Sequence, residues 1–222
     1  MRNKFAFWSL ILGGALLFGA PSAIGTNGLI NMPTAMSIQY KAFDLGSNWT
    51  LVQNNSSSAQ NQIHYYGNLG IFEGVELGFL GNNQTEGVFL NLKYYMLSDK
   101  SNYPLGLAVG LTNISSHSNS NLYLVLSKKF PNQLTGHFGF ASNILATKIQ
   151  ANVMFGLEMP FSNYVNAFAE LIGSQDSWVL SAGTRLKLAD DLLLNAYWDD
   201  IGNSSAGKST FSLGISWHGI LQ

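Results

Sequence analysis

Strict alternation of side-chain character between Ile149 and Met159 constrains the fold of this 222-residue chain more than any other feature. One set of alternate residues is entirely apolar: Ile149, Ala151, Val153, Phe155, Leu157 and Met159. The set between them is mostly polar or small: Gln150, Asn152, Met154, Gly156 and Glu158. Successive side chains of a β-strand point to opposite faces, so the stretch predicts a strand with one apolar and one polar face.

The same alternation recurs along the chain, and the apolar face is usually the one with the larger side chains. Twelve such segments follow one another from Ala42 onward: 42–51, 63–71, 75–79, 88–94, 105–111, 121–127, 134–145, 149–159, 165–171, 178–188, 192–198 and 211–217. Lipid is the simplest solvent for the apolar faces. The sequence therefore predicts an all-β fold, a transmembrane antiparallel up-and-down barrel of about 12 strands over residues 42–222. A soluble sheet with an apolar core is the alternative.

Composition excludes several other classes of protein. The formal net charge is -1 and only 10% of residues are charged, so neither a nucleic-acid-binding surface nor an acidic tail is expected. The chain has no cysteine, which rules out disulfides and thiolate metal sites. No phosphate-binding glycine motif or metal-ligand cluster occurs either, and no cofactor is predicted.

The first residues have the features of a secretory signal peptide. Arg2 and Lys4 are followed by an apolar run over residues 5–18 and then by small residues, with cleavage predicted after Gly25. A retained anchor is the alternative, but the run is shorter than the roughly 20 residues that span a bilayer. We expect residues 1–25 to be the leader, 26–41 a periplasmic or lumenal segment, and the location to be a bacterial outer membrane.

The connections between the segments predict the orientation. One alternate set is rich in Asn, Ser and Gly and includes the longest loops, whereas the other set carries more charge. Because barrels place their longer loops outside, both termini are expected in the periplasm. The expected partners are outer-membrane lipid and the outer-membrane assembly machinery. Aromatic residues expected in the interfacial girdles are Trp49, Tyr94, Tyr95, Trp178, Trp198 and Trp217.

A short motif follows the leader and precedes the first strand. It consists of Gly28, Leu29, Ile30, Asn31, Met32, Pro33, Thr34 and Ala35. Its proline does not suit a central strand, so an ordered segment at the barrel mouth or inside the lumen is expected. The motif resembles the opening of the YjbH-type outer-membrane proteins associated with exopolysaccharide operons. The resemblance implies a barrel connected with making or exporting a surface polysaccharide.

Eight charged residues occupy inward positions of the predicted strands. They are Asp44, Glu76, Lys93, Glu158, Glu170, Arg185, Lys187 and Asp199. They could form a constriction that selects solutes by charge. Alternatively, five acids and three bases could pair with one another and fill a narrow lumen.

An outer-membrane lipid hydrolase is the enzymatic alternative, and it requires a serine with a histidine base within reach. His117 beside Ser118 lies in a polar loop, and His137 and His218 point inward without an acid at an informative spacing. We therefore predict that the protein is not an enzyme.

Three functions remain open from the sequence. The first is an accessory or passage for cell-surface material, with exopolysaccharide as the candidate suggested by the motif. The second is a general porin for small solutes. The third is a non-conducting structural or surface-display barrel, which a filled lumen would favour.

Overall fold

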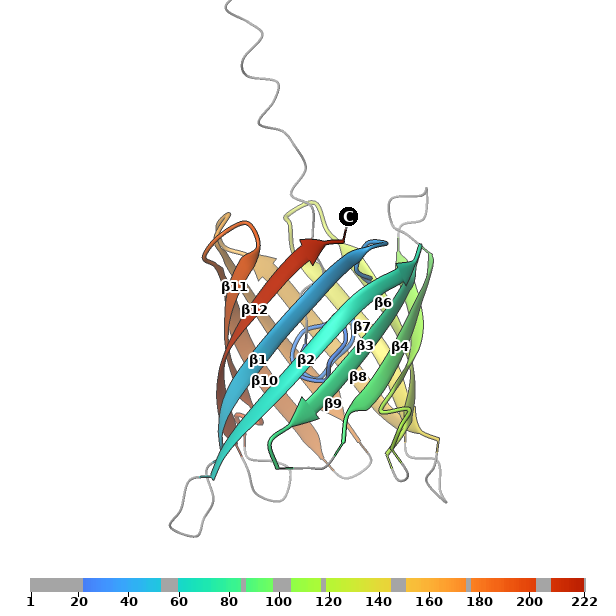
Figure 1. The fold of residues 1–222 in the computed structure, drawn as a ribbon. Helices are drawn as coiled ribbons and strands as arrows, with labels where there is room; N and C mark the ends of the chain where they lie inside the picture. Colours follow the sequence, from blue (N-terminus) through green and yellow to red (C-terminus); the bar gives the residue numbers. More distant parts are fainter. Residues whose placement is uncertain are drawn as a thin grey trace, which may run out of the picture.

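Twelve antiparallel β-strands form the body of the protein in its computed structural model (Figure 1). The structure describes residues 22–52, 60–84, 87–97, 105–116, 119–144, 151–174, 177–202 and 209–221. The strands are β1 (Ala42–Val52), β2 (Gln60–Phe72), β3 (Val75–Asn82), β4 (Phe89–Leu97), β5 (Gly106–Thr112), β6 (Asn121–Lys129), β7 (Thr135–Asn143), β8 (Ala151–Pro160), β9 (Val165–Gly173), β10 (Trp178–Lys187), β11 (Leu192–Asp199) and β12 (Thr210–Ile220). Each alternating segment of the sequence coincides with one strand. The basic start and apolar run of the predicted leader, and the pair His117 and Ser118, lie outside the described residues.

The sheet closes on itself. Every strand pairs with its neighbours in sequence, and β1 pairs with β12 in a register that runs from Ala42 opposite Ile220 to Val52 opposite Thr210. The predicted fold, an up-and-down all-β barrel of twelve strands, is therefore confirmed. The last strand is longer than predicted, because β12 continues past Trp217 to Ile220.

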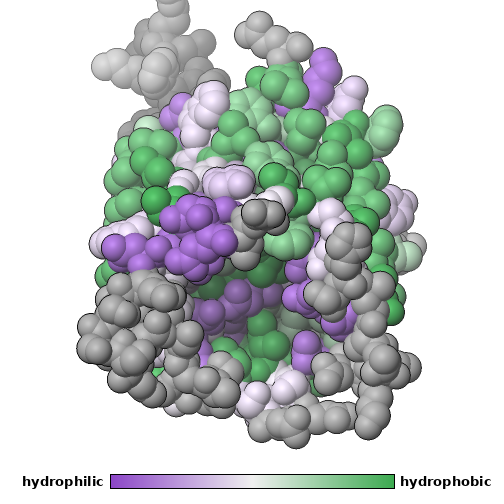
Figure 2. Space-filling model, turned by 60° about the horizontal axis from the view of Figure 1, so that its bottom comes forward, coloured by the Kyte–Doolittle hydropathy of each residue, from purple (hydrophilic) through white to green (hydrophobic). Residues whose placement is uncertain are grey.

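Large apolar side chains cover the outside of the barrel. On β12, Phe211, Leu213, Ile215 and Trp217 are exposed, whereas Ser212 and Ser216 on the other face are buried in the interior. The sides of the molecule are correspondingly hydrophobic, and hydrophilic residues gather at the end that faces the viewer (Figure 2). The described residues contain no helix that is long and apolar enough to cross a membrane. The alternation thus separates an apolar outer wall from a polar interior.

One of the aromatic residues expected on the outside faces inward instead. Trp49, Tyr94, Trp178, Trp198 and Trp217 are all exposed. Tyr95, in contrast, packs in the interior against an apolar cluster, so its assignment to a girdle is wrong. The reason is the pleat, since Tyr94 and Tyr95 are consecutive in β4 and must point to opposite faces.

Residues 22–41, which we call the lumenal segment, fold back inside the barrel (Figure 1). Leu29, Ile30, Met32 and Ala35 are at most 2% exposed. Their neighbours are wall residues: one cluster joins Met32 and Ala35 to β5, β6 and β8, and another joins Leu29 and Ile30 to β9 and β11. The apolar core of the protein therefore lies between this segment and the inner wall.

The two ends of the barrel differ. The start of β1 and the C-terminal end of β12 lie at the same end, which we call the terminal end (Figure 1). The connections that follow odd-numbered strands lie at the opposite end, which is turned forward in Figure 2. The lumenal segment leaves the interior at the terminal end, where the Lys41 amide donates to the Gly70 carbonyl at 2.8 Å.

Candidate functional site in the barrel lumen

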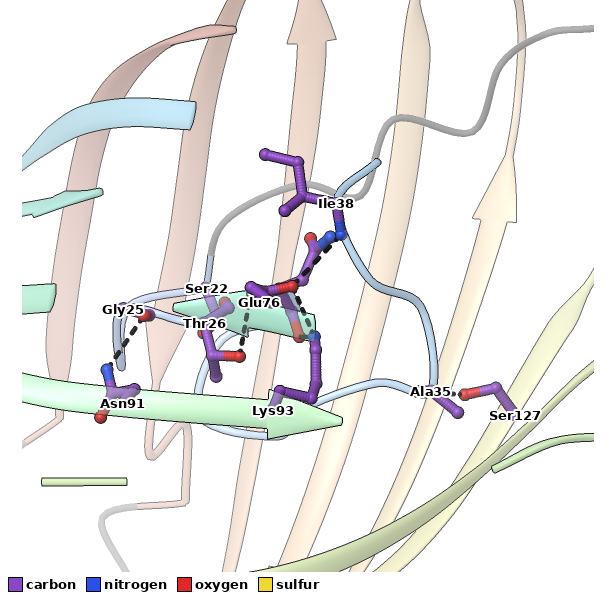
Figure 3. A network of polar contacts seen from close by, with 10 residues as sticks. Ser22, Gly25, Thr26, Ala35, Ile38, Glu76, Asn91, Lys93 and Ser127 are labelled. Atoms are coloured by element: carbon purple, nitrogen blue, oxygen red, sulfur yellow. Dashed lines mark hydrogen bonds and ion pairs between the residues drawn. The ribbon is translucent and has the colours of Figure 1, made fainter. Parts of the chain in front are cut away.

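A buried ion pair holds both arms of the lumenal segment. Glu76 on β3 and Lys93 on β4 are directly opposite each other in the strand register, and their side chains meet at 3.1 Å with 1% exposure each. Glu76 accepts hydrogen bonds from the Thr26 hydroxyl (2.8 Å) and from the amides of Asn27 (2.7 Å) and Ile38 (3.3 Å). Lys93 donates to the Asn27 carbonyl at 3.0 Å. The pair therefore binds both arms of the segment, at residues 26–27 and at Ile38 (Figure 3).

A second carboxylate, Glu170 on β9, binds the turn of the segment. It accepts the amides of three consecutive residues, Ile30 (3.0 Å), Asn31 (2.8 Å) and Met32 (3.0 Å). Successive backbone N–H groups that converge in this way form an anion-binding concavity. The Asn31 side-chain amide also donates to Asp199 at 2.9 Å. The turn therefore offers its donors to two wall carboxylates.

Arg185 on β10 binds the opposite side of the same turn. Its guanidinium donates to the carbonyls of Gly28 (2.6 Å) and Leu29 (2.8 Å). It also lies 3.8 Å from a carboxylate oxygen of Glu158 and 4.5 Å above the Phe168 ring. Cationic and anionic wall residues thus bind adjacent carbonyl and amide groups of one short stretch of backbone.

Ser127 on β6 and His137 on β7 form a third anchor, which the sequence analysis missed. The Ala35 amide donates to the Ser127 hydroxyl at 2.8 Å, and that hydroxyl lies 2.7 Å from His137 Nδ1. On the other side of the ring, His137 Nε2 lies 3.6 Å from a carboxylate oxygen of Glu158. The two inward positions are opposite in the strand register, and this pairing is the signal that could have linked them.

The order serine, histidine, carboxylate is also that of an activated nucleophile. Here the Ser127 oxygen accepts a hydrogen bond from the Ala35 amide, and Ser127 is only 5% exposed. The group therefore holds the lumenal segment in this structure. Within the described residues, no group of three or more His, Cys, Asp or Glu side chains is placed to hold a metal ion.

The segment is anchored before the predicted cleavage site as well. The Ser22 hydroxyl donates to the Thr26 carbonyl (2.6 Å), and the Ala23 amide donates to the Ile30 carbonyl (2.8 Å). Asn91 on β4 donates to the carbonyls of Ile24 and Gly25, both at 2.9 Å. Residues 22–25, which the sequence assigns to the leader, thus lie inside the lumen.

Seven of the eight charged residues named from the sequence lie in the interior and one lies at its rim. The interior residues are Asp44, Glu76, Lys93, Glu158, Glu170, Arg185 and Asp199. Lys187, at the end of β10, is 40% exposed and pairs with Asp190 at 2.8 Å. This pairing lowers the pKa of the exposed Asp190 carboxyl. Asp44 is 2% exposed, and its Oδ2 has no hydrogen-bond partner in the described part of the chain.

Little space remains between the segment and this part of the wall. The pocket bounded by Ala23, Leu29, Asn48, Phe168, Arg185, Asn195 and Tyr197 has a volume of about 10 Å³. This is close to the minimum that holds one water molecule. The lumenal segment therefore packs closely against this part of the wall.

Solved structures of porins share this fold. The structure of the KdgM porin in complex with disordered oligogalacturonate superposes with a TM-score of 0.61 at 10% sequence identity, covering 78% of this chain and 98% of that one. The NanC porin gives a TM-score of 0.59 at 10% identity over the same shares. No protein-family model matches the chain, and no curated protein matches it. The chain thus has a porin-type fold, and its resemblance to the YjbH-type proteins stays a prediction.

Proposed function

We propose that the protein is an outer-membrane barrel through which small polar solutes pass, and that the lumenal segment holds it closed until it is displaced. The porin-type fold and the apolar outer wall support the membrane assignment, because lipid-exposed strands must close into a barrel. By the loop pattern, both termini face the periplasm, and the barrel reaches its place through the outer-membrane assembly machinery.

The observation that carries the proposal is the way the segment is attached. In the described structure, side chains of the wall bind the backbone of the segment. The isolated β-bridge that the segment forms joins two of its own residues, Gly28 and Pro33, and no wall residue. No barrel strand forms a ladder with it among the described residues. Displacing residues 22–38 would therefore break side-chain contacts with the wall and leave the backbone bond from Lys41 to Gly70 and all twelve strand pairings in place.

A non-conducting structural barrel is the second candidate, and the filled lumen favours it. In that case the segment would be a permanent core that replaces the hydrophobic interior of a soluble protein. The two candidates differ in one property, which is whether the barrel conducts ions once the segment is released.

Surface polysaccharide as the transported material is a narrower proposal that the resemblance alone supports. The motif that carries the resemblance, Gly28 to Ala35, is the part of the segment bound by Glu170, Arg185 and Ser127. Normal surface polysaccharide in a deletion strain would count against this cargo and would leave the channel proposal standing.

The deciding experiment measures conductance in planar bilayers with the segment released and then locked. Ile30→Pro together with Met32→Pro removes two of the three amides that bind Glu170 without changing any charge. We expect rare openings in the natural chain and frequent openings in this release variant. Tyr40→Pro, at a residue that is 57% exposed, is the control and should behave like the natural chain.

A disulfide tests whether movement of the segment is the cause. A Cβ added at Gly106 would lie 3.5 Å from the Ala35 Cβ, within the range of disulfides, and the chain has no other cysteine. In the release variant that also carries Ala35→Cys and Gly106→Cys, oxidation should abolish the current and reduction should restore it. A folded, reduced release variant that does not conduct would establish the structural barrel instead.

A further inference from the structure

The interior carries more negative than positive side chains. Among the described residues, the strands place five carboxylates in the interior, those of Asp44, Glu76, Glu158, Glu170 and Asp199, and two cations, Lys93 and Arg185, which gives these positions a formal charge of -3. Lys187 does not offset this charge, because it lies at the rim and pairs with Asp190. The lumenal segment does not offset it either, since residues 22–40 contain no charged side chain.

Only two of the five carboxylates have a cation within ion-pair distance in the described structure. Lys93 pairs with Glu76 and Arg185 with Glu158. Glu170 and Asp199 instead receive N–H donors from the segment: three backbone amides on Glu170 and the Asn31 side chain on Asp199.

A third carboxylate, Asp44, has a hydrogen-bond acceptor that the described residues leave unused. It is 98% buried, and its Oδ2 has no hydrogen-bond partner among the described residues. In the strand register it lies opposite Asn68 of β2 and His218 of β12. A buried carboxylate oxygen without a donor is costly unless a donor or cation can reach it.

We infer that the open lumen selects cationic solutes that carry N–H donors, such as amines and guanidinium compounds, over anionic ones. This inference rests on the proposed channel function and names its class of solute. In the closed state the amides of Ile30, Asn31 and Met32 donate hydrogen bonds to Glu170. The N–H groups of such a solute would bind Glu170 in the same way. When the segment leaves, Glu170, Asp199 and Asp44 face water without a cationic partner.

Two physical effects favour cations in that state. Carboxylates that line a pore select cations directly, because they attract the permeating ion and repel anions. The surrounding apolar wall also concentrates the potential of these charges in the lumen. A solved structure of the KdgM porin, which has a similar fold, is of its complex with disordered oligogalacturonate, an oligosaccharide of acidic sugars. On this inference the present barrel disfavours such a solute.

The test measures the reversal potential of the release variant, Ile30→Pro with Met32→Pro, across a KCl gradient. We expect a potential of the sign given by preferred K⁺ permeation. Adding Glu170→Gln and Asp199→Asn should lower the permeability ratio of K⁺ to Cl⁻ several-fold. Adding Glu73→Gln, which removes an exposed carboxylate from the β2–β3 turn, should leave the ratio unchanged.

Block of the current provides a second readout. Spermidine should reduce the K⁺ current through the release variant at lower concentration than trigalacturonate, and the Glu170→Gln and Asp199→Asn changes should remove this difference. An anion preference, or a ratio that the two changes do not alter, would overturn the inference while the channel stands. A folded release variant without current would overturn the channel proposal and the inference with it.

Discussion

Individual wall residues hold the lumenal segment through the amides and carbonyls of its backbone, in addition to the packing of its apolar side chains against the wall. Glu170 binds three amides, Arg185 binds two carbonyls, and Glu76 binds two amides and a hydroxyl. Hydrogen bonds to ionised groups are the stronger kind, and burial strengthens them further. The anchoring of the segment is therefore concentrated in a few charged side chains of the wall.

The ion pair between Glu76 and Lys93 gives a prediction at this scale. Lys93→Met leaves the Glu76 carboxylate buried without its cation, and breaking such a pair typically costs about 3–5 kcal/mol of unfolding free energy. Glu76→Gln combined with Lys93→Met should cost less than Lys93→Met alone, because no buried charge is left unpaired. Urea unfolding in lipid vesicles, followed by tryptophan fluorescence, measures both variants.

Lys187→Met is the control for this prediction. It removes a cation of the same type from an exposed pair at the rim, and exposed pairs contribute little to stability. Equal destabilisation by Lys187→Met and Lys93→Met would show that burial of the Glu76–Lys93 ion pair does not matter for stability. A double variant less stable than either single variant would contradict the prediction as well.

At the scale of elements, the strands and the lumenal segment differ in how far the sequence predicts them. A strand of this barrel can be recognised from the alternation within its own roughly ten residues, because one of its faces meets apolar surroundings and the other a polar lumen. The structure differs from the expectation only locally: Tyr95 faces the interior, unlike its neighbour Tyr94, and β12 continues past Trp217 to Ile220.

The lumenal segment has no such local signal. Its structure depends on partners far along the chain: Ile30 binds Glu170 across 140 residues, and Gly28 binds Arg185 across 157. Sequence periodicity identified these wall residues as inward but could not pair them with a backbone amide or carbonyl. It also could not link Ser127 to His137 and Ala35, because that anchor needs the strand register and the segment together.

A glycine on β3 allows the segment to lie against the wall, which gives a prediction for this element. A Cβ added at Gly78 would stand 2.2 Å from the Gly25 carbonyl oxygen, so Gly78→Ala must displace the segment or the strand. We expect a loss of about 1–3 kcal/mol in unfolding free energy, typical of overpacking, and faster proteolysis of the segment from the terminal end. Mass spectrometry of the fragments identifies the cleavage sites.

Gly136→Ala is the matched control on the outer face. Its added Cβ would have the Phe130 ring as its nearest contact, at 3.2 Å, and that side chain can move away. Equal proteolysis of the two alanine variants would show that Gly78 has no particular role in seating the segment.

At the scale of the whole molecule, the β1–β12 seam determines whether the sheet is a barrel at all. The seam joins strands from the two ends of the chain, and its eleven register pairs make it the longest ladder in the structure. A long ladder suits this position, because closure brings together segments that are far apart in sequence and must offset the loss of chain entropy. Lipid adds a stricter requirement, since an unpaired strand edge in hydrocarbon costs several kcal/mol per polar group.

The residues after Trp217 are therefore expected to be needed for closure. Deleting residues 218–222 removes the pairs of Asp44, Phe43 and Ala42 from the seam, together with the bond from the Leu221 amide to the Lys41 carbonyl. It leaves the start of β1 as an open edge beside the exit of the lumenal segment. We expect a large loss of folded, heat-modifiable barrel on electrophoresis. Deleting only residues 221–222 keeps all eleven pairs and should preserve the folded form, so equal yields from the two deletions would show that closure is complete at Trp217.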